Sequence, residues 1–170
     1  GTGKTLAFLL PMVQSFLSKT VTKGAQAVVL SPTRELAIQI HETFQLLTQG
    51  TSLRAAIVVG GMNENKQLHQ IRQGAQVLIA TPGRLCDFLQ RHLVQMDRVR
   101  FFVLDEADRM LDMGFLPSIK TILKTVPANR QTLFFSATIE KSVAHLVESH
   151  VKNPARVAIG SVSKPTEQVD

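Results

Sequence analysis

The chain has 170 residues, of which 44% are hydrophobic, enough to fill one apolar core and to form a single domain. The apolar residues are too scattered for a membrane span, and a lone cysteine excludes an internal disulfide framework and favours a reducing, cytoplasmic setting. The net charge of +6 favours a polyanion such as nucleic acid as partner, while the absence of Trp and Tyr argues against binding by base stacking.

The chain opens with GTGKT at residues 1–5, the second half of the P-loop pattern GxxxxGK[ST]. In a P-loop, backbone amides cradle phosphates, the lysine reaches the β and γ phosphates, and the threonine hydroxyl meets Mg²⁺. The front of the pattern and the strand before it do not occur, so we expect the chain to begin inside the motif. Five residues alone also fit an ordinary glycine turn that opens a helix. Apolar residues at helical spacing follow and predict one buried helix face: Leu6, Leu9, Leu10, Val13 and Leu17.

Residues 26–30 (QAVVL) predict a strand that ends in Ser31-Pro32-Thr33-Arg34-Glu35. Ser31 is a candidate N-cap for the helix that follows, and Pro32 suits its first helical position. The inward residues of this helix recur at helical spacing: Leu36, Ile40, Phe44 and Leu47.

A second strand is predicted over residues 53–59 and ends at Gly60-Gly61. A polar helix with Leu68 and Ile71 follows and closes at Gly74. The next strand, residues 76–80 (QVLIA), ends in Thr81-Pro82-Gly83-Arg84.

The junctions after residues 30 and 80 share one plan: a hydroxyl residue, a proline, one further residue and an arginine. Each presents backbone amides and a guanidinium at the C-terminal edge of the sheet, which suits the phosphates of an extended nucleic-acid strand. A capped helix with a solvated arginine explains either junction alone. The repetition, together with Gly60-Gly61 permitting close approach of a ligand, favours the phosphate-binding interpretation.

The apolar run FFVL at residues 101–104 ends in Asp105-Glu106-Ala107-Asp108. A fully apolar run is typical of a strand buried on both faces of a parallel sheet. Acids at its C-terminal end then project from the edge where open α/β sheets bind ligands. In phosphoryl-transfer sites such an acid holds Mg²⁺, and a second acid beside it can orient or deprotonate the attacking water.

Helical spacing continues after Asp108, breaks at Gly114, and resumes up to Val126. A strand over residues 131–135 then ends in Ser136-Ala137-Thr138. Two interpretations stay open: Thr138 caps the next helix and Ser136 satisfies local backbone groups, or both hydroxyls hydrogen-bond Asp108 and link the acidic corner to the rest of the edge. The inward residues of the next helix are Val143, Leu146 and Val147.

A last strand is predicted over residues 155–159, before a polar tail that runs from Gly160 to Asp170. Strands alternate with helices throughout, which predicts an α/β domain with a mainly parallel sheet between helices. We assign residues 1–160 to this domain and residues 161–170 to a linker.

The combination of these segments resembles the DEAD-box ATP-dependent RNA helicases in identity, order and spacing, over nearly the whole chain. The matching motifs are Gly3-Lys4-Thr5, Pro32-Thr33-Arg34-Glu35-Leu36-Ala37, Gly60-Gly61, Thr81-Pro82-Gly83-Arg84, Asp105-Glu106-Ala107-Asp108 and Ser136-Ala137-Thr138. The resemblance implies the first RecA-like P-loop domain of such a helicase, lacking its first strand.

The resemblance also implies a role for each motif, with ATP and Mg²⁺ as cofactors. Lys4, Asp105 and Glu106 are the implied catalytic residues, and Glu106 positions or activates the hydrolytic water. The nucleotide is bound by Gly1, Thr2, Gly3, Lys4, Thr5, Asp105 and Glu106, and Thr5 and Asp105 hold Mg²⁺ largely through water. The RNA backbone is contacted by Pro32, Thr33, Arg34, Gly60, Gly61, Thr81, Pro82, Gly83 and Arg84. Asp108, Ser136 and Thr138 couple the ATP state to unwinding.

Parts of the family pattern do not occur in the chain: the upstream glutamine segment that reads adenine, and the second RecA-like domain with its arginines. Such arginines are worth about 10³-fold or more in related phosphoryl transfer. We therefore expect the chain alone to show negligible ATPase activity and no unwinding, and the parent protein, which we expect to be monomeric, to show both. Two alternatives stay open: a nucleic-acid-binding module with a degenerate nucleotide site, and a DNA-directed helicase or translocase.

Overall fold

Within the described residues, five strands of four residues each form one parallel sheet in the order β2-β3-β1-β4-β5. The computed structural model describes residues 2–156. Its strands are β1 Ala27–Leu30, β2 Ala55–Val58, β3 Val77–Ala80, β4 Phe101–Leu104 and β5 Gln131–Phe134. Its helices are α1 Thr2–Leu17, α2 Arg34–Leu47, α3 Glu64–Arg72, α4 Pro82–Gln90, α5 Ala107–Asp112, α6 Leu116–Leu123 and α7 Lys141–His150. The predicted α/β fold with a parallel sheet between helices is confirmed.

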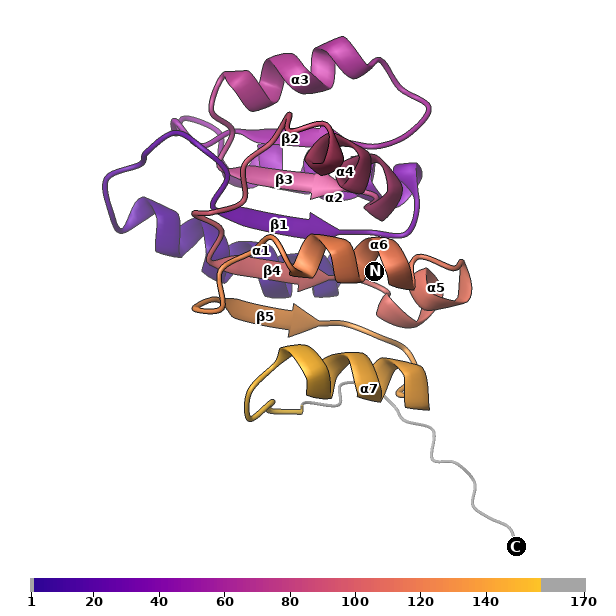
Figure 1. Cartoon of the computed structure of the whole chain (residues 1–170). Coiled ribbons are helices and arrows are strands. Elements are labelled where there is room, and N and C mark those ends of the chain that lie inside the picture. The colour runs from indigo at the N-terminus through magenta and orange to yellow at the C-terminus, as the bar shows by residue number, and fades with distance from the viewer. Residues whose placement is uncertain (1, 157–170) are drawn as a thin grey trace, which may run out of the picture.

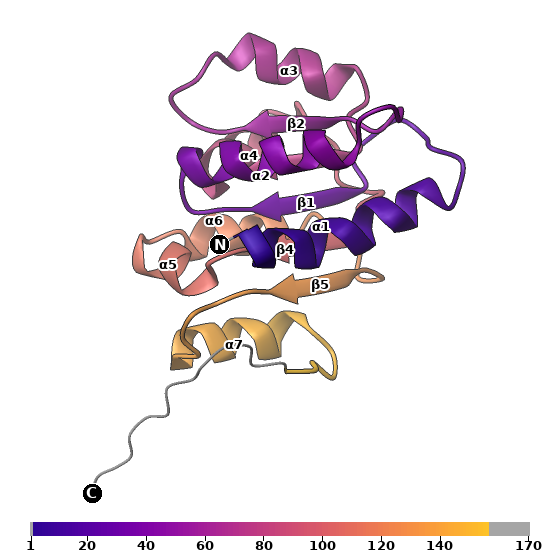
Figure 2. The same cartoon turned by 180° about the vertical axis from the view of Figure 1, so that it is seen from behind.

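Helices cover both faces of the sheet. In Figure 1, α4 and α6 lie in front of the sheet, with α3 beyond β2 and α7 beyond β5. Figure 2 shows α1 and α2 on the opposite face. Alternate residues of each strand therefore enter two separate apolar cores: Val28 and Leu30 pack with α3 to α7, while Ala27 and Val29 pack with α1 and α2.

Burial on both faces explains why the strands read as continuous apolar runs rather than as alternating ones. Every residue of β1 and β3 is buried, and so are the last three of β4. β5 differs because it lies at one edge of the sheet: Gln131 is exposed and the rest of the strand is half-buried.

Two sequence-based expectations about helix starts are wrong, and one about a helix face is only partly confirmed. Of the predicted face of α1, Leu9 and Val13 are buried, whereas Leu10 and Leu17 are 49% and 47% exposed. Phe8, Met12 and Phe16 complete the buried face. Phe8 and Phe16 carry more apolar surface than Leu10 and Leu17, so burying the phenylalanines turns their side of the helix to the sheet. The α1 helix also begins at Thr2, so the predicted lysine motif lies in its first turn rather than before it.

The α2 helix begins two residues later than predicted. Its N-cap is Thr33, whose hydroxyl accepts a hydrogen bond from the Leu36 amide at 3.2 Å, and Ser31 and Pro32 lie outside the helix. Ser31 is fully buried and extends the sheet ladder, because its N–H donates to the Ala80 carbonyl at 2.9 Å. Ser31 thus still belongs to the end of the sheet, and Thr33 is the residue whose side chain reaches an amide of the first helical turn.

The predicted last strand over residues 155–159 is not seen at Ala155 and Arg156, and its other residues lie outside the described part of the chain, as do the predicted linker residues. Within residues 2–156, no helix has the combined length and hydropathy that crossing a membrane requires.

Truncation of Leu78, which is fully buried in β3, is expected to lower the free energy of unfolding. Leu78→Ala should cost about 2–5 kcal/mol, because it removes apolar packing and leaves a cavity between packed elements. Leu46→Ala is the matched control, since Leu46 is 69% exposed and its truncation should change stability by no more than about 0.5 kcal/mol. Urea unfolding of the two variants measures the difference, and equal costs would contradict the packing described.

Candidate functional site

The segments predicted to carry chemistry meet at the C-terminal edge of the sheet. Strand register aligns Leu30 with both Ala80 and Leu104, and Leu104 with Phe134, so the residues after these four strands leave the sheet side by side. The first turn of α1 lies at this same edge, on the side of the arrowheads in Figure 1. The lysine motif and the acidic corner are therefore neighbours, as the motif interpretation requires.

Asp105 is a buried carboxylate directly after β4. Only 6% of the residue is exposed, and its Oδ1 atom has no hydrogen-bond partner within residues 2–156. Burial raises the pKa of Asp105 above its ordinary value; the Lys4 ammonium opposes this rise, and the Glu106 carboxylate adds to it. The influence of Lys4 shows that its charge lies close to Asp105, although the two side chains form no ion pair.

The surroundings of Asp105 fit a divalent cation with oxygen ligands. A buried carboxylate oxygen without a donor is costly unless a positive charge faces it. Thr5, half-buried in the first turn of α1, carries a hydroxyl at the same edge. Within residues 2–156, no cluster of three or more His, Cys, Asp or Glu side chains is arranged to enclose a metal. A single buried carboxylate on an edge that also carries a hydroxyl is a donor set that Mg²⁺ can use, since this ion usually takes one or two carboxylates and fills its octahedron with water and phosphate oxygens.

Ser31, predicted as a helix cap, belongs to this edge instead. It follows β1 in the register that pairs Leu30 with Leu104, so it lies beside Asp105. Its Oγ atom is buried and, like Asp105 Oδ1, has no hydrogen-bond partner among the described residues. Two neighbouring buried oxygens, Ser31 Oγ and Asp105 Oδ1, therefore have hydrogen-bonding capacity that no group of the described residues satisfies. The sequence does not indicate that Ser31 lies beside Asp105, because a serine between a strand and a helix equally fits a helix N-cap.

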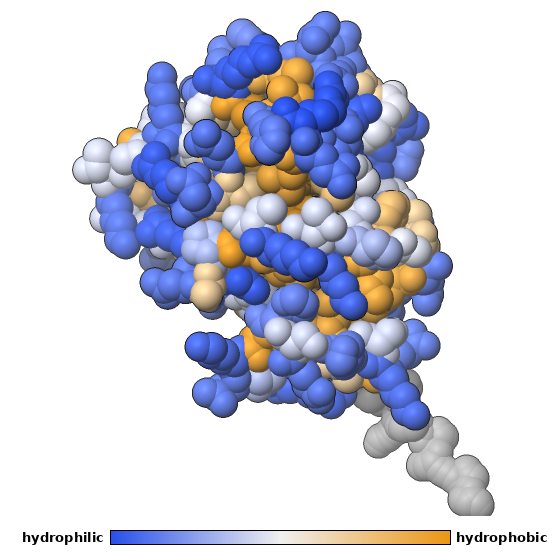
Figure 3. Space-filling view, in the orientation of Figure 1, coloured by the Kyte–Doolittle hydropathy of each residue, from blue (hydrophilic) through white to orange (hydrophobic). Residues whose placement is uncertain are grey.

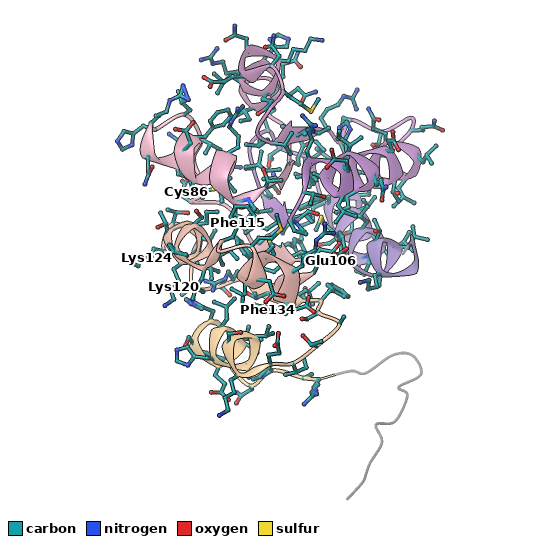
Figure 4. The ribbon with its side chains drawn as sticks, turned by 90° about the vertical axis from the view of Figure 1, so that its right-hand side faces the viewer. Cys86, Glu106, Phe115, Lys120, Lys124 and Phe134 are labelled. Carbon is teal, nitrogen blue, oxygen red and sulfur yellow. The ribbon has the colours of Figure 1, made fainter. Side chains whose placement is uncertain are left out.

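Glu106 has a left-handed backbone, with φ 55° and ψ 52°. This conformation is unusual for a residue with a Cβ and costs of order 1 kcal/mol or more. It is held by the Ala107 N–H, which donates to the Phe135 carbonyl at 2.9 Å, and it turns the chain from β4 into α5 within two residues. Figure 4, which looks onto this edge, places Glu106 near its centre. Its side chain is 28% exposed and faces Arg109 at 3.4 Å.

Asp108 joins α5 to the segment that follows β5. The Thr138 hydroxyl donates to Asp108 Oδ2 at 3.1 Å, and the Thr138 N–H donates to the same oxygen at 3.2 Å. Ser136 acts differently from the expectation that both hydroxyls bond the carboxylate: its Oγ accepts from the Asp108 N–H at 3.2 Å and donates to the Thr138 carbonyl at 2.6 Å. The alternative that Thr138 caps α7 is wrong, since the N-cap of α7 is Glu140.

The hydrogen bonds at Asp108 also set its charge state. Burial acts to raise the pKa of Asp108, but donation from the Thr138 hydroxyl and the Arg109 amide outweighs it and holds the pKa below its ordinary value. The ionised carboxylate therefore stabilises the link between α5 and the Ser136–Thr138 segment at neutral pH.

Arg34 and Gly61, from the two predicted phosphate-binding segments, are in direct contact. Arg34 Nη1 donates to the Gly61 carbonyl at 3.3 Å. Gly61 has φ +77°, and a Cβ there would lie 2.8 Å from the same guanidinium nitrogen. A side chain at position 61 would therefore be strained and would displace Arg34. Gly60 and Gly83 meet no such neighbour, so the chain's own packing leaves open space above them.

Arg84 is positioned by Gln67, a residue that no sequence motif indicated. Arg84 Nη1 donates to Gln67 Oε1 at 3.1 Å, and the guanidinium lies 5.6 Å from the centre of the Phe88 ring. Gln67 is 4% exposed and donates to the Val59 carbonyl at 2.9 Å, which ties α3 to the end of β2. A glutamine in an otherwise polar helix offers no pattern that distinguishes it.

Thr81 is the N-cap of α4 but makes no side-chain capping bond, and Pro82 is the first residue of the helix. Its hydroxyl is thus not used by the helix, in contrast to that of Thr33. Gly1 lies outside the described residues. The structure therefore brings the predicted residues into two neighbouring groups on one edge, with Asp105 in one and Arg34 and Arg84 in the other.

A buried acid beside a helix N-terminus that carries a lysine lies at the C-terminal edge of a parallel sheet, the place where open α/β sheets bind ligands and helix N-termini bind phosphates. The DEAD/DEAH box helicase family model matches residues 1–146. The chain belongs to the DEAD/DEAH box helicase family.

Named relatives and solved structures agree with this assignment. The chain is 42% identical over 170 residues to the ATP-dependent RNA helicase CshA of Limosilactobacillus reuteri, covering 100% of the chain and 34% of that protein. It is 42% identical over 167 residues to the ATP-dependent RNA helicase DBP3 of Saccharomyces cerevisiae, covering 98% of the chain and 32% of that protein. The chain thus spans about a third of the length of these curated relatives.

Among solved structures, the yeast DEAD-box splicing factor Prp28 matches with a TM-score of 0.86 and 34% identity over 95% of this chain and 40% of that one. A DEAD box protein from the hyperthermophile Methanococcus jannaschii matches with a TM-score of 0.81 and 33% identity, over 89% of this chain and 40% of that one.

Asp105→Asn is expected to raise the free energy of unfolding at neutral pH. Because the folded pKa of Asp105 is raised, its carboxylate destabilises the fold increasingly as pH rises from the ordinary value of 3.8 through the raised pKa. The amide removes this charge, so its stabilising effect should be largest at neutral pH and small below pH 3.8. Urea unfolding at both pH values measures it.

Asp112→Asn, which removes an exposed carboxylate at the end of α5, is the matched control and should change the free energy of unfolding by no more than about 0.5 kcal/mol. An Asp105→Asn variant that is equally stabilised at both pH values, or destabilised at neutral pH, would contradict the burial of an unpaired charge.

Proposed function

We propose that the protein containing this domain is an ATP-dependent RNA helicase that couples ATP hydrolysis to local unwinding of RNA duplexes. The observation that carries this proposal is the buried Asp105 Oδ1, an oxygen without a donor that lies near the Lys4 charge, on the edge that also holds the RNA-binding candidates. The names of the relatives, which are ATP-dependent RNA helicases, support the choice of nucleotide and nucleic acid.

In this proposal, Lys4 and the amides of residues 1–5 bind the phosphates of ATP, at the positive N-terminus of α1. Thr5 and Asp105 hold Mg²⁺ largely through its water ligands, and the bound ion supplies charge neutralisation at the β and γ phosphates. Burial of Asp105 gives the cation an oxygen ligand that no side chain of the described residues competes for.

Glu106 is the proposed residue that orients or deprotonates the attacking water. Its left-handed backbone holds the carboxylate next to Asp105 without placing it in the sheet, and its partial exposure keeps it open to water. A carboxylate acts as a base when it lies within hydrogen-bond reach of the proton it takes.

The RNA backbone lies, in this proposal, along the second group of residues. Arg34 and Arg84 offer guanidiniums, Thr81 offers its hydroxyl, and the open space above Gly60 and Gly83 admits a phosphate. Pro32, Thr33 and Pro82 shape the two junctions, and Gly61 holds Arg34 through its carbonyl. Asp108, Ser136 and Thr138 then couple the ATP state to unwinding, because their hydrogen bonds join α5, next to the acidic corner, to the segment after β5.

We further propose that a second RecA-like domain completes the ATP site, so that the 170-residue chain alone has negligible ATPase and no unwinding activity. The buried single cysteine fits our proposal of a cytoplasmic protein, which we expect to be monomeric.

Glu106→Gln in the full-length protein is expected to lower RNA-stimulated ATP hydrolysis by about 10²–10⁴-fold, the usual worth of general acid–base catalysis, while the fold survives. Phosphate release at saturating RNA measures the rate, and thermal unfolding checks the fold. Glu148→Gln, on the exposed part of α7, is the control that should keep full activity. Unimpaired turnover in Glu106→Gln would end the assignment.

The second candidate function is a nucleic-acid-binding module whose nucleotide site is degenerate, which the short GTGKT match to the phosphate loop favours. It predicts RNA binding that does not depend on ATP. In both cases, replacing Arg34 and Arg84 with Gln should flatten the dependence of log affinity on log salt by about 0.7 for each phosphate of a single strand that is no longer neutralised. Titrating labelled RNA at several salt concentrations, with and without ATP, separates them: an affinity that changes with ATP in the full-length protein would discard the module.

A DNA-directed motor on the same core is tested by competition between RNA and DNA strands of the same base sequence, since only RNA carries 2′-hydroxyl groups. Preference for RNA supports the helicase proposal, and equal or stronger binding of DNA contradicts its choice of substrate.

A further inference from the structure

The residues that immediately precede the five strands form a row along the opposite, N-terminal edge of the sheet. Register aligns Ala55, Val77, Ala27, Phe101 and Gln131 across the sheet, so the residues before them are also aligned. In spatial order the row reads Arg54, Gln76, Gln26, Arg100 and Arg130. Neighbouring strands lie about 4.8 Å apart, so the row is roughly 19 Å long. No position in it is apolar or acidic.

The loops that lead into the strands strengthen the positive charge of this row. Residues 18–26, 48–54, 73–76, 91–100 and 124–130 contain eight lysines and arginines and one carboxylate, Asp97. The basic residues are Lys19, Lys23, Arg54, Arg91, Arg98, Arg100, Lys124 and Arg130. Among the described residues only Arg91 of this set is in an ion pair, with Glu64 and Asp87. Figure 3 shows this left-hand edge as mostly hydrophilic.

Neutral groups hold these guanidiniums in place. Arg54 Nη1 donates to the Leu53 and Thr51 carbonyls at 2.8 and 2.9 Å. Arg98 donates to the Thr22 hydroxyl at 3.3 Å and to the Lys23 carbonyl at 3.4 Å. These bonds fix the arginines and leave their charge unneutralised, which reduces the entropy lost when an anion binds.

Arg100 and Arg130, the other two arginines of the row, are also held by neutral groups. Arg100 lies 5.3 Å from the centre of the Phe16 ring, and Arg130 donates to the Pro127 and His150 carbonyls at 2.9 and 3.3 Å. Burial lowers the pKa of Arg130, the direction expected of a guanidinium with no counter-charge beside it.

The loop that carries Lys23 is fixed against the row. The Gln26 side chain donates to the Thr22 hydroxyl at 2.9 Å, and the Gln76 side chain donates to the Thr22 carbonyl at 2.9 Å. Lys23 packs over Gly74, where a Cβ would lie 2.6 Å from the lysine Cβ. Lys23, Arg54 and Arg98 are exposed, so their charges face solvent from a rigid base.

We propose that this basic edge is a second polyanion-binding surface, which takes the phosphate backbone of an RNA segment other than the one at the C-terminal edge. The edge offers exposed cations at Lys23, Arg54 and Arg98, next to the half-buried Arg100 and Arg130, and such cations suit a phosphate backbone bound without sequence recognition. An acidic protein partner fits less well, because protein interfaces depend on apolar or aromatic anchors and the five row positions have none. The proposal rests on the proposed function only in taking RNA as the polyanion.

The test replaces three exposed cations of this edge in the full-length protein: Lys23→Gln, Arg54→Gln and Arg98→Gln together. A control triple variant, Lys66→Gln, Lys120→Gln and Lys141→Gln, removes the same charge from exposed positions on α3, α6 and α7. A second variant, Arg54→Lys with Arg98→Lys, keeps the charge and removes the guanidinium hydrogen bonds. The probes are a long polyuridine strand that can reach both edges and a short one that fills the C-terminal edge only.

We expect the first triple variant to bind the long strand with a log–log salt slope flatter by roughly 2, at about 0.7 for each cation removed from the backbone, and to bind the short strand unchanged. The control triple and the lysine variant should keep the original slope, and all variants should unfold at similar urea concentrations. Equal salt slopes in the two triple variants would overturn the proposal, and so would equal weakening of the binding of the long and the short strand. It would also be overturned if the first triple variant lost an acidic protein partner while its RNA binding stayed unchanged. The readout is RNA binding without ATP. This result therefore does not depend on whether the Glu106→Gln variant loses its ATPase activity.

Discussion

The feature on which the rest of the molecule depends is the burial of one carboxylate, Asp105, where β4 leaves the core. The apolar run before it is packed on both faces, so the first polar residue after it cannot move into water. An unpaired buried charge is costly, and among the chain's own groups the nearby Lys4 ammonium compensates it most. The fold therefore keeps in place a cost that a bound cation relieves, and the left-handed turn at Glu106 adds to it.

On each side of the C-terminal edge, hydrogen bonds rather than apolar packing hold the polar side chains in place. Asp108 binds Thr138 through its carboxylate and Ser136 through its backbone amide. Arg34 and Arg84, on the other side of the edge, are held by Gly61 and Gln67. These are polar bonds at exposed or half-buried positions, which rearrange at low cost when ligands bind.

Patterns of apolar residues and motifs predicted the parallel sheet, the meeting of the motifs along one edge and most helices, because buried strands and capped helices follow from local composition. They did not predict which face of α1 is buried, since Phe8, Met12 and Phe16 compete with Leu10 and Leu17 for the core. They placed Ser31 in a cap because the ladder bond that holds it comes from another strand. Gln67 and the backbone of Glu106 were missed for the same reason: both are set by interactions between elements far apart in sequence.

The brevity of the strands sets the electrical behaviour of the domain. Each strand has four residues at about 3.3 Å each. Roughly 13 Å of sheet therefore separates the C-terminal edge, which carries Asp105, from the N-terminal edge, which carries the basic row. At physiological ionic strength the Debye length is about 8 Å, so around the outside of the molecule the field of one edge is largely screened before it reaches the other. The domain therefore behaves as two electrically separate ends, and occupation of one end by an anion leaves the attraction of the other nearly intact.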